Sequence, residues 1–528
     1  MTAATSIAAM RAHAWSCPSI LVFGCWLSSA ACGGSGGGDD DVDVPGDLVV
    51  ALPQAHGGAL GASAAVYAEV PLRIEVSGEP DTVAVSFRNA EIAAVRDGND
   101  WVARLPLTGA QDGDYPVVAR ATDGGGTSTA AATLVLRAAG MQVTEVGRDG
   151  KAGTPRLHVA GSQWFLTWTD LRDGGRKARI AEVDGAGRFV GEPRVLLTAA
   201  EDIIAARTAL GGDAVGVLYQ HPGGGPYKNV FAVVGRDGAP RVAPIDLDPV
   251  GMYGSFGGDV IFDGEAFVLI YRINDGAGTS HIRWLRVTAA GQVTGPVTVA
   301  AAGMENPHGG FDPITHIDVE LAGNAVMVAF KRELYDASLE LSIPRCEVVT
   351  VDSNGGVGEL TYAATGGLDW HHDCRLLRDN RGTLLMWGAQ DLTDDSTEPP
   401  TALRAATFNG AALDAARGRG ALVVTAPLHR SEPALVDGVM AWLDQRSYQN
   451  LTAGRIELYA APLARPGEGA GLAAGPPTVI GHARFIEGTA ELGGVAAGSN
   501  RVMVWIDERH GGSILNPRPE VYVDTLWY

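Results

Sequence analysis

The chain has 528 residues, of which 61 are acidic and 40 are basic, and its net charge at pH 7 is −21. A surface this acidic repels phosphate backbones, so we expect no nucleic-acid partner. The 71 glycines and 28 prolines, without a helical period of apolar residues, predict many short strands and turns and therefore an all-β fold. The length predicts about two to four domains, unless one part is a large closed β-structure.

Residues 1–31 have the pattern of an export signal. Arg11 precedes the apolar stretch Ile20–Leu27, which is far shorter than the ~20 residues that span a bilayer as a helix. We therefore predict that this segment is removed and does not remain as a membrane anchor.

The sequence "LSSAAC", which ends at Cys32, is followed by "GGSGGGDDDVDVPG". This stretch resembles the lipobox and tether of bacterial lipoproteins. The resemblance implies that Cys32 is acylated and becomes the new amino terminus, so that the chain joins the membrane through a lipid. Residues 32–46 would then be a flexible tether, because a Gly/Asp-rich stretch buries no apolar surface. Gly33 after the cysteine is typical of an outer membrane lipoprotein of the cell envelope, facing the periplasm or the cell surface. An ordinary secretory signal cut nearby is the alternative.

Residues 47–140 predict a first small domain. They contain six strand-like runs separated by turn residues, which is the content of an immunoglobulin-like sandwich. The stretch "DGDYPVVARATD" resembles the penultimate strand of bacterial immunoglobulin-like modules, and that resemblance places Tyr115 in the tyrosine-corner position. We expect this domain to be a spacer.

Residues 141–528 contain a repeat. An apolar run ends in an aromatic residue seven times, at intervals of 51 to 63 residues: Trp168, Tyr219, Tyr271, Phe330, Trp387, Trp442 and Trp505. Turn glycines keep the same phase: Gly185, Gly238, Gly291, Gly355, Gly410 and Gly467. Units of this length with about four strands each predict a seven-bladed β-propeller. The apolar runs do not alternate with polar residues, so both faces of each sheet should be covered.

The two ends of this region predict how the propeller closes. Met141–Val146 is strand-like but precedes the first unit, whereas the last unit has room for only one strand after Trp505, around Glu520–Trp527. Pairing of these two segments would complete the last blade and remove its exposed edges. We therefore expect the amino-terminal and carboxy-terminal strands of the region to close it.

Three units carry a Trp-x-Asp-x-Arg triplet: Trp168, Asp170 and Arg172; Trp442, Asp444 and Arg446; Trp505, Asp507 and Arg509. We expect the tryptophan to fill the wedge between neighbouring blades. The aspartate should accept hydrogen bonds from the following turn, and the arginine should pair with that carboxylate or with carbonyls of a neighbouring blade. The triplets resemble repeats in propeller-containing lipoproteins of environmental Gram-negative bacteria, which implies a surface lipoprotein.

Two further cysteines, Cys346 and Cys374, lie within the repeats. In an oxidising compartment they form either a disulfide or two buried thiols, and the sequence leaves both alternatives open.

Polar residues near the starts of innermost strands are candidates for a channel mouth: Asp259, His316, Asp318, His371, Asp373, Arg430 and Glu432. Histidines and carboxylates of adjacent blades are ligand types for calcium or another divalent metal, and paired carboxylates perform glycoside hydrolysis. The simpler interpretation is that they are polar rim residues, and we expect no cofactor. No Gly-rich phosphate loop, His-Glu-x-x-His or Gly-x-Ser-x-Gly occurs in the sequence.

The favoured hypothesis is thus a non-catalytic binding or scaffold protein, anchored by lipid, that presents a propeller face to a protein or glycan ligand. The alternative is a secreted carbohydrate-active or other hydrolase with its site at the channel mouth.

Overall fold

The fold is known from a computed structural model, and every regular element in the described part of the chain is a strand. The all-β prediction is therefore confirmed. In the same part, no helix is long and apolar enough to cross a membrane. The signal segment, Cys32 and the tether lie outside the described residues, which are 48–63, 67–137, 141–142, 153–171, 175–197, 203, 205–222, 227–247, 252–275, 278–303, 314–336, 341–363, 369–379, 381–391, 401–408, 421–425, 433–444, 455–464, 473–475, 477–484, 492–497, 500–507, 520–525 and 527.

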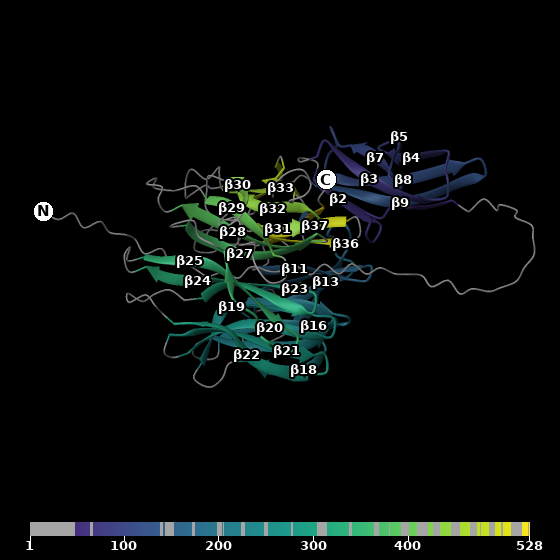
Figure 1. The fold of residues 1–528 in the computed structure, drawn as a ribbon. Coiled ribbons are helices and arrows are strands. Elements are labelled where there is room, and N and C mark those ends of the chain that lie inside the picture. The colour runs from purple at the N-terminus through teal and green to yellow at the C-terminus, as the bar shows by residue number, and fades with distance from the viewer. Residues whose placement is uncertain are drawn as a thin grey trace, which may run out of the picture.

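Residues 48–137 form two sheets that pack face to face, and we call this part the sandwich (Figure 1). Strand β2 runs parallel to β9, and the other pairs are antiparallel. The first sheet has the order β1 (Val49–Ala51), β3 (Glu69–Ser77), β7 (Asp100–Pro106) and β6 (Val95–Asp97). The second has the order β2 (Ala59–Ser63), β9 (Gly126–Arg137), β8 (Gly113–Asp123), β4 (Thr82–Phe87) and β5 (Ala90–Ala93).

The core of the sandwich follows from strand periodicity. Along β3 every second side chain is buried, at Val70, Leu72 and Ile74, because successive side chains of a strand point to opposite faces. At the start of β8, the Tyr115 hydroxyl donates a hydrogen bond to the carbonyl oxygen of Gln111 at 2.8 Å. A hydrogen bond from a tyrosine hydroxyl back to a nearby upstream carbonyl is the contact that the resemblance implied for Tyr115.

Between Met141 and Thr525 the structure describes seven more sheets, which together we call the ring. In chain order, the first three are β11 (Gly153–Ala160), β12 (Gln163–Asp170), β13 (Lys177–Val183) and β14 (Arg194–Leu197); β15 (Ala205–Gly211), β16 (Ala214–Pro222), β17 (Tyr227–Gly235) and β18 (Pro240–Asp246); and β19 (Met252–Phe262), β20 (Ala266–Asp275), β21 (Ser280–Thr288) and β22 (Val293–Ala302).

The fourth and fifth sheets are β23 (Ile314–Ala322), β24 (Ala325–Asp336), β25 (Leu341–Asp352) and β26 (Thr361–Tyr362); and β27 (Asp369–Asp379), β28 (Gly382–Asp391), β29 (Thr401–Phe408) and β30 (Ala421–Thr425). The sixth contains β31 (Ala434–Val436), β32 (Val439–Asp444) and β33 (Arg455–Ala464), with β34 (Ala473–Ala474) and β35 (Thr478–Arg484) both paired to β33. The seventh contains β36 (Leu492–Ala497), β37 (Asn500–Asp507), β38 (Glu520–Thr525) and β10 (Met141–Gln142).

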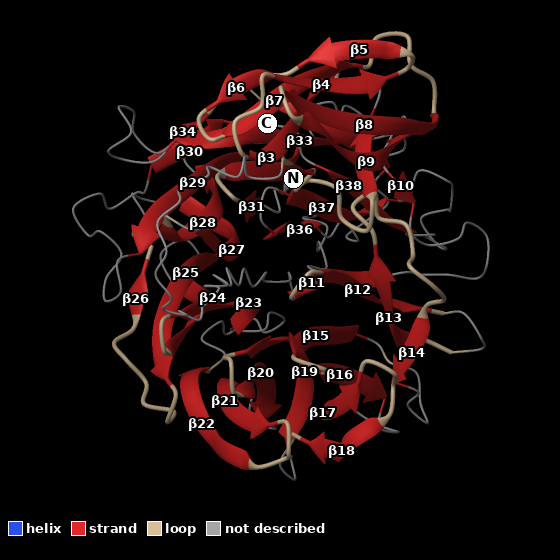
Figure 2. Cartoon of the chain, turned by 90° about the vertical axis from the view of Figure 1, so that its right-hand side faces the viewer, coloured by secondary structure: helices blue, strands red, loops and turns tan. Residues whose placement is uncertain are grey.

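The first strands of these sheets are neighbours in a cyclic order. Strand β11 lies beside β15, and the series continues through β19, β23, β27, β31 and β36 back to β11. Figure 2 shows the sheets arranged around a centre, and these first strands lie nearest to it. Each sheet is thus flanked by two others, which makes the ring propeller-like.

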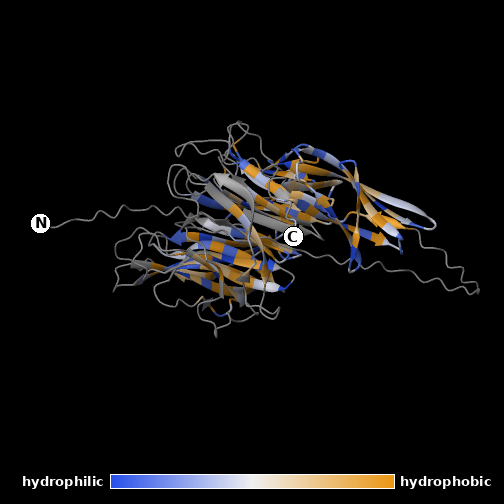
Figure 3. Ribbon diagram, turned by 90° about the horizontal axis from the view of Figure 1, so that it is seen from above, coloured by the Kyte–Doolittle hydropathy of each residue, from blue (hydrophilic) through white to orange (hydrophobic). Residues whose placement is uncertain are grey.

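The second strands of the ring sheets, such as β12 and β20, are covered on both faces, whereas outer strands such as β18 and β22 are largely exposed. Along β20, the eight positions from Ala266 to Ile273 are all buried, without the alternation seen in β3. Figure 3 shows hydrophobic residues concentrated on the strands of both parts of the molecule. The seven repeat aromatics lie on the second strand of their sheets, and all are buried. Their predicted role in packing between sheets is therefore consistent with where they lie.

The last sheet joins both ends of the ring. Met141 pairs with Val523 and Gln142 with Tyr522, in the antiparallel sense. The side-chain amide of Gln142 also donates to Glu520 Oε2 at 2.6 Å. The described strand is shorter than the expected Met141–Val146, but it pairs with the segment that the sequence predicted.

The turn glycines explain why neighbouring sheets fit closely. Gly238 has φ of 81°, and a Cβ built on it would lie 2.3 Å from the carbonyl oxygen of Val195 in the preceding sheet. Gly355 lies close to Val297 of its preceding sheet in the same way. Only glycine combines this backbone conformation with this approach.

The first turn makes the same contact across the closure of the ring. Here it is Gly187, with φ of 78°, that lies against Val523 of the seventh sheet, and not Gly185, on which the repeat pattern had placed the turn glycine. A Cβ on Gly185 would instead lie 2.4 Å from the carbonyl oxygen of Ala59 in the sandwich. Gly410 and Gly467 lie outside the described residues.

A disulfide joins Cys346 on β25 to Cys374 on β27, with the Cα atoms 5.6 Å apart. Both side chains are buried. Of the two alternatives left open by the sequence, the structure has the bridge, and it ties the fourth sheet to the fifth.

Candidate functional site

Charged side chains from the first strands meet at the centre of the ring. We call Arg156, Asp259, Asp318, Glu320 and Arg375 the central cluster. They come from β11, β19, β23 and β27, and each is at most 5 % exposed. Charged side chains are rarely buried this deeply unless they are paired.

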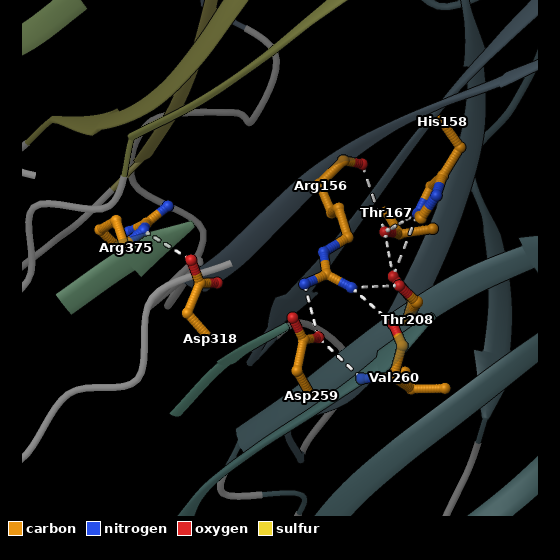
Figure 4. Close-up of polar contacts among 8 residues, drawn as sticks. All are labelled: Arg156, His158, Thr167, Thr208, Asp259, Val260, Asp318 and Arg375. Carbon is orange, nitrogen blue, oxygen red and sulfur yellow. Dashed lines mark hydrogen bonds and ion pairs between the residues drawn. The ribbon is translucent and has the colours of Figure 1, made fainter. Parts of the chain in front are cut away.

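Arg156 links three sheets (Figure 4). From β11, its Nη1 donates to the carbonyl oxygens of Thr208 on β15 at 2.7 Å and Val260 on β19 at 3.0 Å. Its Nη2 donates to Asp259 Oδ1 at 2.6 Å, which makes a buried ion pair. The rigid fork of the guanidinium group suits this arrangement, because it directs several N–H groups at fixed angles.

Asp259 is fully buried, and its Oδ1 also accepts a hydrogen bond from the backbone N–H of Val260 at 2.7 Å. Among the described residues, its Oδ2 has no hydrogen-bond partner. A buried carboxylate oxygen without a donor is costly, so this position depends strongly on the charge of Arg156.

A second ion pair links the fourth and fifth sheets. Asp318 Oδ2 lies 3.5 Å from Arg375 Nε and accepts a hydrogen bond from the backbone N–H of Leu376 at 2.7 Å. Figure 4 shows this pair beside the Arg156 and Asp259 pair.

Glu320 adds a third carboxyl group to the cluster. Its Oε1 accepts a hydrogen bond from the backbone N–H of Leu321 at 3.1 Å. Burial raises the pKa of Glu320 well above its ordinary value, and the charges of Asp318 and Asp259 act in the same direction, whereas Arg378 opposes them. Glu320 is therefore protonated over a much wider pH range than an exposed glutamate.

His158 lies next to the cluster with two threonines (Figure 4). Its Nε2 is 3.1 Å from Thr167 Oγ1 and 3.2 Å from Thr208 Oγ1, and the two hydroxyl oxygens are 2.6 Å apart. Burial lowers the pKa of His158 to about 3, and the charge of Arg156 adds to this effect. The ring is thus neutral at pH 7 and takes part in a network of uncharged groups.

Two of the seven channel-mouth candidates, Asp259 and Asp318, belong to the central cluster, but they are not rim residues. Each is buried and ion-paired. The physical reason is strand length: β19 begins at Met252 and β23 at Ile314, so these aspartates lie within their strands and not at the start.

The other candidates are placed less fully. His316 lies on β23, two residues before Asp318, with φ of 48°. The backbone of His371 and Asp373 belongs to β27, where the register is irregular between His372 and Arg375, and their side chains are not described. Arg430 and Glu432 lie outside the described residues.

Sequence reasoning missed Arg156, His158, Glu320 and Arg375. A signal existed for Glu320: it follows Asp318 by two residues on a strand, so both point to the same face. Arg156 gives no comparable signal, because its partners are 52 and 103 residues away in the sequence.

In the first Trp-x-Asp-x-Arg triplet, the described contacts of the aspartate are ones that the sequence did not predict. Asp170 accepts hydrogen bonds from Trp168 Nε1 at 2.9 Å and from Arg179 Nε on the next strand at 2.8 Å. Both charged groups are buried, so this contact is an internal ion pair. Arg172, Arg446 and Arg509 lie outside the described residues, and Asp444 and Asp507 are described in their backbone only.

The described carboxylates of the central cluster are not arranged as a metal site. In the described ranges, no group of three or more His, Cys, Asp or Glu residues is arranged to hold a metal ion. Arginine is the partner of the carboxylates Asp259 and Asp318. The chemistry of the cluster is therefore that of internal ion pairs.

Comparison with protein-family models and with curated proteins gives no match. Among solved structures, the chain is similar to a neuraminidase-like protein of A/little yellow-shouldered bat/Guatemala, with a TM-score of 0.38, 7 % identity and coverage of 74 % of this chain and 97 % of that one. A variant of the Synechocystis apocarotenoid oxygenase has a TM-score of 0.35, 10 % identity and coverage of 74 % and 90 %. The α-L-arabinofuranosidase from Lactobacillus brevis has a TM-score of 0.30, 11 % identity and coverage of 52 % and 88 %.

Proposed function

We propose that this chain is a lipid-anchored binding or scaffold protein of the cell envelope, in which an immunoglobulin-like sandwich and a seven-bladed propeller present an interaction face. The sandwich assignment is supported by its two facing sheets and by the Tyr115 contact. The propeller assignment is supported by the cyclic order of first strands and by the shared last sheet.

The burial of the central carboxylates carries the choice of a binding role over hydrolysis. A glycoside hydrolase needs two carboxyl groups that reach the scissile bond from either side. Asp259 and Asp318 are at most 1 % exposed, and each is paired with an arginine from another sheet. Such groups brace the centre of the ring and leave ligand recognition to its outer surfaces.

A glycan array and a hydrolase screen on residues 47–528 test this role. We expect binding to a glycan or protein surface without turnover, and the same binding by an Asp259→Asn variant that remains folded. Turnover that is lost in Asp373→Asn or His371→Ala, but retained in the exposed Asp213→Asn control, would establish the hydrolase in its place.

The lipid anchor is tested separately. We expect radiolabelled palmitate to be incorporated into the wild-type protein in Gram-negative cells and not into Cys32→Ser. Equal incorporation by the two proteins, or none by either, contradicts acylation at Cys32, and leaves the binding role to be judged on the array.

A further inference from the structure

The carboxy-terminal tryptophan of the chain lies in the core of the amino-terminal sandwich. Trp527 is 5 % exposed and belongs to the same buried cluster as Leu60 and Leu136. Its indole N–H donates to the carbonyl oxygen of Gly61 on β2 at 2.8 Å. Its backbone N–H lies 3.4 Å from the Tyr67 hydroxyl, to which it donates. A side chain from the end of the ring thus completes the core of another domain.

The same segment also closes the ring. Trp527 follows β38 by two residues, and β38 pairs with β37 on one side and with β10 on the other. Strand β10 in turn follows the last strand of the sandwich, β9, which ends at Arg137. The sandwich is therefore joined to the seventh sheet twice: by the chain that leaves it and by the tryptophan that enters it.

A packed interface surrounds this double connection. The His56 ring stacks on Trp164 of β12, with centroids 4.7 Å apart and planes at 11°. The backbone N–H of Gly185 donates to the carbonyl oxygen of His56 at 3.0 Å, and Arg188 Nη1 lies 3.2 Å from Asp114 Oδ2. The sandwich is thus seated on the ring by specific contacts.

We propose that strand β38 and Trp527 form a clasp that couples seating of the sandwich to closure of the ring, so that the two open and close as one unit. A buried tryptophan removes ~150 to 250 Å² of surface from water, which is a large contribution for a single side chain. Withdrawing Trp527 exposes this surface and the vacated sandwich core together, while β38 loses the end that holds it against β10. The device does not depend on any ligand of the ring.

Hydrogen exchange of backbone amides tests the coupling, with Trp101→Ala as the key variant. Trp101 packs against the same sandwich core from β7, so its removal weakens the sandwich without altering the seventh sheet. We expect Trp101→Ala to raise exchange in β10 and β38 as well as in the sandwich, by about tenfold or more, because the clasp transmits the opening. Exchange that rises in the sandwich alone overturns the proposal.

The Trp527→Ala variant provides the background in which the effect of Trp101→Ala is measured again. It should raise exchange in the sandwich, β10 and β38 together, on the order of a hundredfold. In that background, adding Trp101→Ala should no longer change β10 and β38, because the connection is already lost. A Trp101→Ala effect that persists there shows that another contact transmits it and contradicts the clasp.

Two further measurements test the proposal if Trp527→Ala does not fold: a milder variant and the wild-type protein. Trp527→Phe keeps most of the apolar contact and loses only the N–H bond to Gly61, so it should give the same pattern at a smaller amplitude. In the wild-type protein, amides of β2 and of β38 should exchange through one common opening with the same dependence on denaturant. Different dependences for the two strands contradict the proposal.

Discussion

Arg156 shows how a single residue determines the centre of this molecule. Its guanidinium contacts two carbonyl oxygens and a carboxylate, and these partners lie on two sheets other than its own. Buried pairs of this kind contribute little net stability compared with apolar side chains, but breaking one leaves an uncompensated buried charge. Losing one member of the Arg156 and Asp259 pair should therefore lower the free energy of unfolding much more than the intact pair raises it.

Asp259→Asn should destabilise the protein by about 3 to 5 kcal/mol, because Arg156 then remains buried without its counter-charge. The matched control is Asp213→Asn, which removes the same charge from an exposed pair with Arg241 and should leave the unfolding midpoint unchanged. Urea unfolding of the two variants measures the difference. Equal midpoints would mean that the buried pair contributes no more than the surface pair.

Glu320→Gln should change the dependence of stability on pH. The folded protein holds the pKa of Glu320 above its ordinary value, so its contribution to stability is fully present below the ordinary value and is lost as pH rises through the raised pKa. Glutamine mimics the protonated group and removes this loss. We expect the variant to gain stability relative to wild type on the alkaline side, with urea midpoints measured between about pH 4 and about pH 9. Parallel pH curves for the two proteins would contradict the assignment.

The residues that could be predicted from the sequence are those whose partners are local or periodic. Trp168 and the other repeat aromatics follow from apolar runs of constant spacing, and Tyr115 follows from a single strand and its corner. Arg156 and Trp527 could not be predicted, because each acts on a partner that only the closed fold brings near. The misplaced rim assignment of Asp259 has the same origin, since depth in the ring depends on where a strand begins.

Among the elements, the turns between third and fourth strands control how closely two sheets approach. At Gly238 the turn reaches the carbonyl oxygen of Val195 in the preceding sheet. The same contact recurs between Gly187 and Val523, where the partner sheet is the seventh. One local device therefore operates between consecutive sheets and also between the two ends of the ring.

Gly238→Ala should cost about 1 to 3 kcal/mol more than Gly212→Ala. Both glycines have positive φ, at 81° and 63°, so both substitutions carry the same kind of backbone strain. A Cβ at 212 meets nothing within 4 Å, whereas one at 238 lies 2.3 Å from a backbone oxygen of the neighbouring sheet. Thermal unfolding of the two variants gives the comparison, and equal losses would show that the sheets can move apart freely at this point.

Strands and their order could largely be predicted at this scale, because uninterrupted apolar runs such as Ala266–Tyr271 require cover on both faces. The predicted domain boundary at residue 140 describes the molecule less fully. Strand β9 ends at Arg137 and β10 begins at Met141, on either side of this boundary, but the boundary does not anticipate that Trp527 packs with the first domain. Core membership at a chain end depends on docking, which carries no periodic signal.

At the scale of the whole molecule, the disulfide between Cys346 and Cys374 should stabilise the ring. It closes a loop across two sheets with a sequence separation of 28 residues, for which the loss of chain entropy in the unfolded state corresponds to about 3 to 4 kcal/mol. The double variant Cys346→Ala with Cys374→Ala should lose this amount in urea unfolding. Wild-type protein unfolded in reductant should match the variant, and a variant as stable as the oxidised protein would contradict this role.

The reach of Arg156 also limits how such a chain can change in evolution. Repeats of this kind multiply and shrink by duplication and deletion of whole units, but a guanidinium that spans from the first sheet to the third requires one fixed distance between them. Inserting or removing a unit between these sheets would leave Arg156 buried without its carboxylate partner. The contacts of Arg156 therefore favour one number of sheets between its own sheet and that of Asp259 for as long as both residues are kept.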